Sequence, residues 1–322
     1  MKMLKFRAVL VPKLWGGEAI ANLKGLKSAP ASVGESFEIS ALPGQETICT
    51  TEGFEGLTLT DLIARYGAEL VGRANFARYG SQFPLLIKFI DARQALSVQV
   101  HPDDAMAASL GMPYGKSEMW YVVDTAPEAS LMAGFAEDTD ASRFEEMLAD
   151  GSLMHRVNVY ATSAGDAYYI PAGTIHSIGA GNFIIEVQQS SGATYRVYDF
   201  DRTDEAGHKR ELHVDLARRA LNFCARSDFR RHIEPVPCQP VTVVRSPYFV
   251  TELLRADAPV SRDLAETDSF VAMVCFEGAA TLTDQDGNTE HLTAGETLLI
   301  PASTERIDLR PEPTFACLTA RV

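Results

Sequence analysis

Two twelve-residue segments of the chain match each other without a gap. Residues 165–176 read GDAYYIPAGTIH, and residues 295–306 read GETLLIPASTER. Because proline has no N–H for a sheet ladder, the shared Ile-Pro step indicates a strand that ends in a turn. A repeat of this kind predicts one fold unit used twice. The first copy ends in His176, a residue that binds metals, whereas the second copy ends in Arg306.

Short apolar segments separated by turn signals fill much of the remaining chain, as at Asp286-Gly287-Asn288. This pattern predicts a mainly β fold of two antiparallel jelly-roll barrels with a few short helices. We expect short helices at residues 58–70, 105–110, 140–148 and 215–223. Residues 234–240 contain three prolines and resemble a linker. We therefore predict two domains, residues 1–235 and residues 236–322.

Net charge, apolar runs and cysteine spacing exclude several kinds of function for this chain. The net charge of −14 argues against nucleic-acid binding, and an anionic substrate would need a local cationic pocket. No apolar run approaches the roughly 18 residues that cross a bilayer, and the first residues lack an apolar signal core. From these two features we expect a cytoplasmic protein. The five cysteines form no Cys-x-x-Cys pair, so we expect their thiols to be reduced.

Four side chains have the chemistry of metal ligands. Residues 95–104 alternate apolar and polar side chains, so Gln99 and His101 share one face of a strand. Glu118 begins a later strand, and His176 follows the first copy of the repeat. Each has a simple structural explanation alone, such as a hydrogen-bonded buried histidine. In a small barrel they converge, and two imidazoles, a carboxylate and an amide oxygen suit zinc or a similar divalent metal.

Several segments together resemble a known family. They are residues 96–104, 116–121, 168–179, 186–202 and 210–213. With these segments the chain resembles the type I mannose-6-phosphate isomerases (phosphomannose isomerases), in their short form with two cupin-type barrels. The resemblance implies a catalytic cupin domain in residues 1–235 and a degenerate, metal-free cupin domain in residues 236–322.

The resemblance also implies roles for individual residues. One Zn²⁺ per chain would be held by Gln99, His101, Glu118 and His176. Arg196 and Lys116 would be catalytic, and Lys116, Glu186 and Arg196 would bind the substrate. The implied partner is a small sugar phosphate, without nucleic acid or membrane, for a monomer or weak homo-oligomer.

The implied reaction interconverts D-mannose 6-phosphate and D-fructose 6-phosphate through a cis-enediol. The metal would stabilise the charge that develops on the sugar oxygens. A base must move a proton between C2 and C1, and Lys116 and a metal-bound water are both options. Many family members carry an aspartate four residues before the arginine, where this chain has Gly192. If that aspartate assists proton transfer, this chain must use another group.

Two other functions compete with isomerisation. An iron oxygenase could use His101, Asp103 and His176 as a facial triad. Against it, Pro102 interrupts the strand, and Asp103 is better placed to cap the helix that follows. The second alternative is a non-catalytic sugar-phosphate-binding protein, which the glycine at position 192 keeps open.

Overall fold

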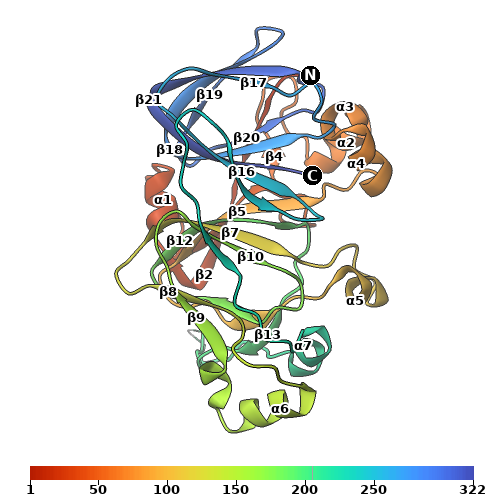
Figure 1. Ribbon diagram of the computed structural model, residues 1–322. Helices are drawn as coiled ribbons and strands as arrows, with labels where there is room; N and C mark the ends of the chain where they lie inside the picture. The colour runs from red at the N-terminus through yellow and green to blue at the C-terminus, as the bar shows by residue number, and fades with distance from the viewer. Residues whose placement is uncertain (205) are drawn as a thin grey trace.

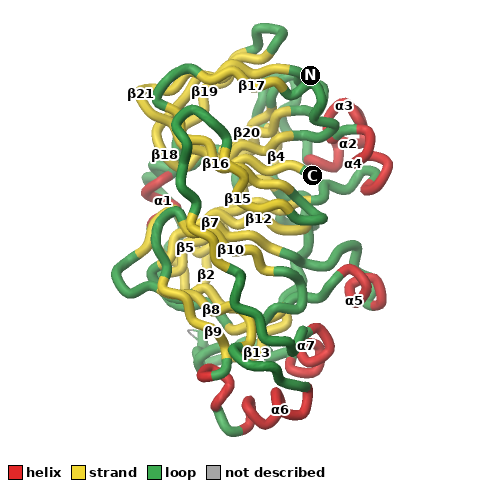
Figure 2. The backbone as a smooth tube through the Cα atoms, in the orientation of Figure 1, coloured by secondary structure: helices red, strands yellow, loops and turns green. Residues whose placement is uncertain are grey.

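The computed structural model describes residues 1–204 and 206–322 of the chain. These residues form three antiparallel sheets of seven, five and nine strands, together with a few short helices (Figure 1 and Figure 2). The prediction of a mainly β fold with few helices is confirmed. We call the seven- and five-stranded sheets the first unit and the nine-stranded sheet the second unit.

The seven-stranded sheet is the central layer of the molecule. Its order is β14-β10-β7-β12-β5-β3-β2. The strands are β2 (Val9–Gly17), β3 (Val33–Ile39), β5 (Leu85–Ala92), β7 (Glu118–Thr125), β10 (Asp166–Ile170), β12 (Asn182–Gln189) and β14 (Arg230–His232). Successive residues of β12 face opposite ways, so Ile185 and Val187 join the core shared with the second unit while Ile184 faces the five-stranded sheet.

The five-stranded sheet covers the other face of this layer. Its strands, in spatial order, are β13 (Tyr195–Tyr198), β6 (Val98–Val100), β11 (His176–Ile178), β8 (Ser130–Phe135) and β9 (Val157–Ala161). Leu131 and Ile178 pack against Trp120 and Ile184 between the two sheets. Within the described residues the sheets face each other as a sandwich, the arrangement expected of a cupin-type unit, and do not close into a barrel. Helices α6 (Ala141–Ala149) and α7 (Val214–Ala220) cover the outer face (Figure 1).

The second unit takes its first strands from the beginning of the chain. Its strands are β1 (Leu4–Arg7), β4 (Ile48–Cys49), β15 (Val241–Arg245), β16 (Val250–Ala256), β17 (Val260–Asp263), β18 (Val271–Asp284), β19 (Thr289–Thr293), β20 (Thr297–Ile300) and β21 (Arg306–Arg321). Strand β1 pairs with β20, with Leu4 opposite Leu299. The chain therefore crosses between the units more than once, and the boundary between residues 235 and 236 stays a prediction.

The sequence repeat corresponds to a repeated piece of backbone. Gly165 precedes β10 with φ +91° and Gly295 precedes β20 with φ +88°, a region that favours glycine. The amide of Thr174 donates to the Pro171 carbonyl, as the amide of Thr304 does to Pro301. His176 then points into the first unit, where it is buried. Its counterpart Arg306 is exposed and pairs with Asp308 at 2.6 Å, and absence of metal from the second unit stays a prediction.

The remaining helices are short. They are α1 (Ala19–Leu23), α2 (Leu59–Tyr66), α3 (Ala68–Val71), α4 (Arg73–Tyr79), α5 (Asp104–Ser109) and the 3₁₀ turn η1 (Ser152–His155). The helix predicted over residues 58–70 breaks at Gly67, whose φ of +47° is not helical and separates α2 from α3. In the part of the chain described here, none of the helices has the length and apolar character that crossing a membrane requires.

Thr58 caps helix α2 and provides a test of the local fold. Its side chain accepts from the Asp61 amide at 3.1 Å, and Asp61 accepts from the Thr58 amide at 3.0 Å. We expect Thr58→Ala to lower the free energy of unfolding by about 1 kcal/mol, because the first turn loses its cap. Thr60→Ala is the matched control, since Thr60 is exposed on the same helix. Equal losses in both variants, measured by urea unfolding, would contradict the cap.

Candidate metal centre and substrate cavity

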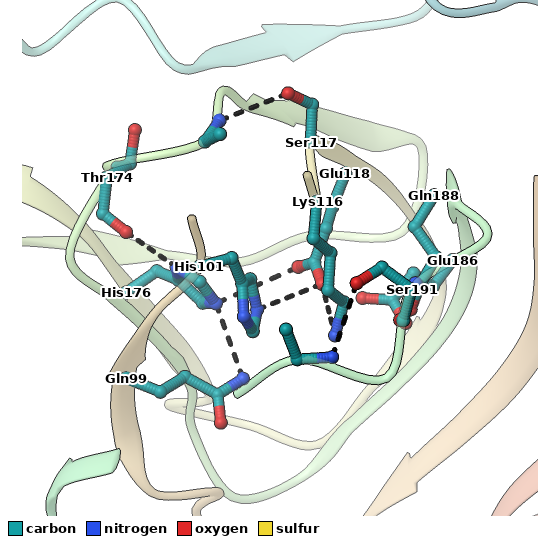
Figure 3. Close-up of polar contacts among 12 residues, drawn as sticks. Gln99, His101, Lys116, Ser117, Glu118, Thr174, His176, Glu186, Gln188 and Ser191 are labelled. Atoms are coloured by element: carbon teal, nitrogen blue, oxygen red, sulfur yellow. Dashed lines mark hydrogen bonds and ion pairs between the residues drawn. The ribbon is translucent and has the colours of Figure 1, made fainter. Parts of the chain in front are cut away.

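Three buried side chains from three strands meet between the two sheets of the first unit. His101 follows β6, Glu118 begins β7 and His176 begins β11. Each is about 1% exposed, and one ligand atom from each lies within 4.8 Å of the others. His101 Nε2 lies 3.1 Å from Glu118 Oε1, and His176 Nε2 lies 3.7 Å from Glu118 Oε2 (Figure 3). The convergence predicted from the sequence is therefore present.

Gln99 lies at the edge of this cluster. It sits in β6 opposite both His176 and Arg196, which belong to the two neighbouring strands. Its Nε2 is 3.3 Å from His176 Nε2, and its Oε1 accepts from Ser97 Oγ at 3.2 Å. For the amide oxygen to join a metal, as the sequence analysis expects, the amide must turn over.

The polar atoms of the cluster have few partners besides one another. Both carboxylate oxygens of Glu118 and both ring nitrogens of His101 are buried, and beyond the ion-pair contacts of Glu118 with the two histidines and Lys116 they make no hydrogen bond to any residue that the structure describes. His176 is oriented from behind, since its Nδ1 lies 2.8 Å from the Thr174 carbonyl oxygen and directs Nε2 to the cluster. Buried polar atoms with so few partners are costly, so these residues fit a bound cation.

The protonation states of the two histidines and Glu118 also favour a bound cation. Burial, and after it the charge of Lys116, lowers the pKa of His101 to about 3, and burial also lowers the pKa of His176. Burial opposes ionisation of Glu118, but the charge of Lys116 and the contact with His101 hold its pKa well below the usual value. At neutral pH the cluster thus offers two neutral imidazoles and one carboxylate, the forms that bind metals.

A second charged cluster lies beside the first on the same face of the sheet. Lys88, in the middle of β5, places Nζ 3.0 Å from Glu35 Oε1 and 2.6 Å from Glu186 Oε2. Trp120 donates its ring N–H to Glu186 Oε1 at 2.9 Å, and Lys13 lies 2.8 Å from Glu35. Glu186 is one of the residues predicted from the sequence, whereas Lys88 and Glu35 were not predicted. A lone lysine inside the buried apolar run LLIKFIDA was the available signal.

The pKa values of the two carboxylates in this cluster are shifted in opposite directions. Burial opposes ionisation of Glu35, yet the charges of Lys88 and Lys13 lower its pKa to about 2. For Glu186, burial and then the charge of Glu118 outweigh Lys88 and raise its pKa to about 7. Burial and Glu118 therefore favour the neutral carboxyl of Glu186, whereas its contact with Lys88 favours the carboxylate.

A cavity of about 160 Å³ joins the two clusters. Lys116 lies in its wall, with Nζ 3.0 Å from Glu118 Oε1 (Figure 3). Three acidic and five cationic side chains line it: Glu35, Glu118, Glu186, Lys13, Lys88, Lys116, Arg196 and Arg210. An excess of positive charge in a chain of net charge −14 indicates a pocket for an anionic ligand.

Two arginines form one end of this cavity. Arg196, on β13, donates from Nη1 to the Glu211 carbonyl at 2.8 Å, and its Nε is buried without a partner among the described residues. Arg210 donates from Nε to Asp199 Oδ2 at 2.7 Å. Burial and then the charge of Arg210 lower the pKa of Arg196, and both arginines line the same cavity. An anion bound there would offset the two like charges.

The alternative triad of an iron oxygenase is not assembled. Asp103 is exposed, and its side chain accepts from the Met106 amide at 2.8 Å as the cap of α5. It lies outside the cluster of His101, Glu118 and His176. The helix cap predicted from the sequence is therefore confirmed, and a facial triad through Asp103 is excluded.

Gly192 stands at the mouth of the cavity. It is exposed and lines the cavity wall, and a side-chain carbon built there would meet no atom within 4 Å in the described structure. No backbone constraint thus requires glycine at this position. The aspartate that the family resemblance implied for this position is absent, and the space beside Gly192 is open.

Comparisons with known proteins agree with this geometry. Residues 3–133 match the family described as phosphomannose isomerase type I, catalytic domain. A mannose-6-phosphate isomerase from Streptococcus mutans is 40% identical over 203 residues, 63% of this chain and 62% of that protein. The Bacillus subtilis protein named “Putative mannose-6-phosphate isomerase YvyI” is 32% identical over 306 residues, 91% of each chain. The solved structure of a Bacillus subtilis mannose 6-phosphate isomerase, 27% identical, covers 100% of both chains with a TM-score of 0.86.

Removal of either histidine should abolish metal binding. We expect His101→Ala and His176→Ala to lose most of the divalent metal that the parent retains after dialysis, measured by plasma mass spectrometry. Each substitution removes one of few ligands from a buried site. His291→Ala is the matched control, because His291 is exposed in the second unit and pairs with Glu312. Full metal content in both variants would refute the site.

Glu35 should stabilise the fold in a pH-dependent way. We expect Glu35→Gln to lower the free energy of unfolding by roughly 2–4 kcal/mol at pH 7, since Lys88 and Lys13 lose a buried counter-ion. The folded pKa of about 2 lies below the ordinary 4.5, so this stability is complete above pH 4.5 and is lost as pH falls toward 2. Denaturant unfolding at several pH values should therefore show the parent and variant converging in acid. A difference independent of pH, or an equal loss in the exposed-site control Glu18→Gln, would contradict this assignment.

Proposed function

Because the chain belongs to the type I mannose-6-phosphate isomerase family, we propose that it interconverts D-mannose 6-phosphate and D-fructose 6-phosphate through a cis-enediol. The main support for this proposal is the position of the metal cluster next to a cationic cavity. The buried cluster of His101, Glu118 and His176, whose polar atoms have few partners besides one another, adjoins a cavity whose wall has more cationic than acidic side chains. A metal-binding group and an anion-binding group in one cavity match a sugar phosphate that reacts at its other end.

We propose Zn²⁺ as the metal, one per chain, with Gln99, His101, Glu118 and His176 as its ligands. Nitrogen and carboxylate donors in this number suit zinc. When bound, the metal supplies an electrophile that polarises the sugar oxygens at C1 and C2. The Thr174 carbonyl fixes the ring of His176 so that its free nitrogen faces the site.

Two groups are placed to move the proton between C1 and C2. Lys116 is buried, lines the cavity and lies 3.0 Å from Glu118. Glu186 lies in the same wall, and its pKa of about 7 lets it accept or release a proton at neutral pH. Either group could act without the aspartate that is absent at Gly192.

Arg196 and Arg210 provide the charge for the phosphate. The substrate phosphate carries about −2 at neutral pH. Arg210 is held by Asp199, and Arg196 by the Glu211 carbonyl, so both planar donor groups are fixed before the substrate binds.

The sequence also predicts where the protein works and how it assembles. We propose a cytoplasmic location and a monomer or weak homo-oligomer.

The function is tested by a coupled assay. The zinc-loaded protein should convert mannose 6-phosphate to fructose 6-phosphate, and a chelator should abolish turnover. Binding of mannose 6-phosphate without any turnover would favour the alternative of a non-catalytic sugar-phosphate-binding protein. Absence of both binding and turnover would overturn the proposal.

Arg196 should be needed for catalysis. We expect Arg196→Ala to lower kcat/KM by at least about a hundredfold with the metal still bound, the size of effect seen when a transition-state hydrogen bond is removed. Arg196→Lys should recover little, because a point charge does not replace a planar fork of donors. Arg306→Ala is the control and should leave kcat/KM unchanged, because Arg306 is exposed in the second unit, where it pairs with Asp308.

The kinetic constants separate the two roles of Arg196. A raised KM with an unchanged kcat would place Arg196 on the phosphate alone. Activity of Arg196→Ala within a few-fold of the parent would show that Arg196 has no catalytic role.

A further inference from the structure

Gln188 is a buried polar residue that faces the cavity and has no role in the mechanism above. It is completely buried near the end of β12 and lines the cavity. Alternation along the strand puts it on the same face as Glu186. In the sheet register Gln188 lies opposite Glu118, the carboxylate of the candidate metal cluster.

The orientation of the Gln188 amide is fixed by the backbone beside it. Its Nε2 donates to the carbonyl oxygens of Gln189 at 2.7 Å and Ser191 at 2.9 Å, and Figure 3 shows the side chain beside Ser191. These two bonds use both hydrogens of the amide nitrogen. The opposite orientation would place the amide oxygen against two carbonyl oxygens. Oε1 is therefore the atom left over, and it is buried without a partner in the described part of the chain.

The next residue, Gln189, is a glutamine whose amide oxygen and nitrogen both have hydrogen-bond partners. Gln189 is also buried, but it faces the other way. Its Oε1 accepts from the Ser117 amide at 2.9 Å, and its Nε2 donates to Asp104 Oδ1 at 2.9 Å. Of two adjacent buried glutamines, only the one that lines the cavity keeps an acceptor free.

We infer that Gln188 Oε1 accepts a hydrogen bond from one hydroxyl of the sugar bound next to the metal cluster, and that it selects sugars carrying this hydroxyl. The acceptor requires a donor, so a phosphate or a carbonyl oxygen does not satisfy it. A buried acceptor left unpaired by a deoxy sugar costs binding free energy, which is the basis of hydroxyl selection. The inference rests on the proposed function and adds a specificity residue to it.

The test measures coupling between Gln188 and individual hydroxyls. Binding of mannose 6-phosphate and of its 2-, 3- and 4-deoxy analogues is measured by calorimetry on the zinc-loaded parent, Gln188→Met and Gln189→Met. We expect the parent to bind one analogue about tenfold more weakly than mannose 6-phosphate, the effect of one lost hydrogen bond to a buried acceptor. In Gln188→Met that difference should fall to within about twofold, and Gln189→Met should retain it.

A purely structural role of Gln188 predicts a different result. If Gln188 only holds the Ser191 loop, Gln188→Met weakens binding of all four sugars equally and keeps the tenfold difference, which would overturn the inference. If Gln188→Met does not fold, Gln188→Asn replaces it in the same measurement. Asparagine is shorter by one methylene, so it withdraws the acceptor from the cavity.

Failure of the inference differs from failure of the function. A parent that isomerises mannose 6-phosphate but distinguishes none of the analogues overturns the role of Gln188 alone. A parent that neither binds nor isomerises mannose 6-phosphate overturns the proposed function and this inference with it.

Discussion

Charged side chains on the inner face of the seven-stranded sheet have to be compensated by one another, because the two sheets of the first unit exclude most water. Glu35 on β3, Lys88 on β5 and Glu186 on β12 lie on adjacent strands and alternate in sign. The pair of Lys116 and Glu118 follows at β7. The arrangement depends on register: Glu186 stands opposite Lys88 on one side and Trp120 on the other. A slip of one residue in β12 would turn Glu186 into the apolar core shared with the second unit, so the pattern that builds the site also fixes the sheet.

This dependence explains which parts of the molecule could be predicted from the sequence. Period-2 alternation and the repeat sufficed for Gln99, His101 and His176. Pro102 marks the strand end at His101, Gln99 shares its face two residues earlier, and the turn through Pro171 and Gly173 precedes His176. Lys88 could not be assigned in the same way, since its counter-ions come from strands far away in the sequence and only the register brings them together. Nor could the sequence reveal that the Gln99 amide presents its nitrogen to His176, because that orientation follows from a hydrogen bond with Ser97.

Helix caps were easier to predict from the sequence than helix lengths, and the reason is physical. The cap at Asp103 was predicted, because a cap needs only a side chain and an amide a few residues away. The helix over residues 58–70 was predicted as continuous and is wrong at Gly67, where the backbone leaves helical geometry. Apolar spacing of three and four continues across that break, so periodicity alone did not reveal it.

Pairing of β1 with β20 has a consequence for how the chain assembles. Before β20 has been synthesised, β1 can pair only with the two-residue strand β4, and a two-stranded ribbon is marginal in water. The apolar core next to it, which includes Leu4 and Leu299, therefore closes only after nearly all of the chain has left the ribosome. Long-range closure of this kind slows folding and leaves apolar strands exposed during synthesis. Once the pairing has formed, we expect the two units to unfold together, because opening the second unit uncovers the apolar face of the sheet whose other face carries the charges of the cavity.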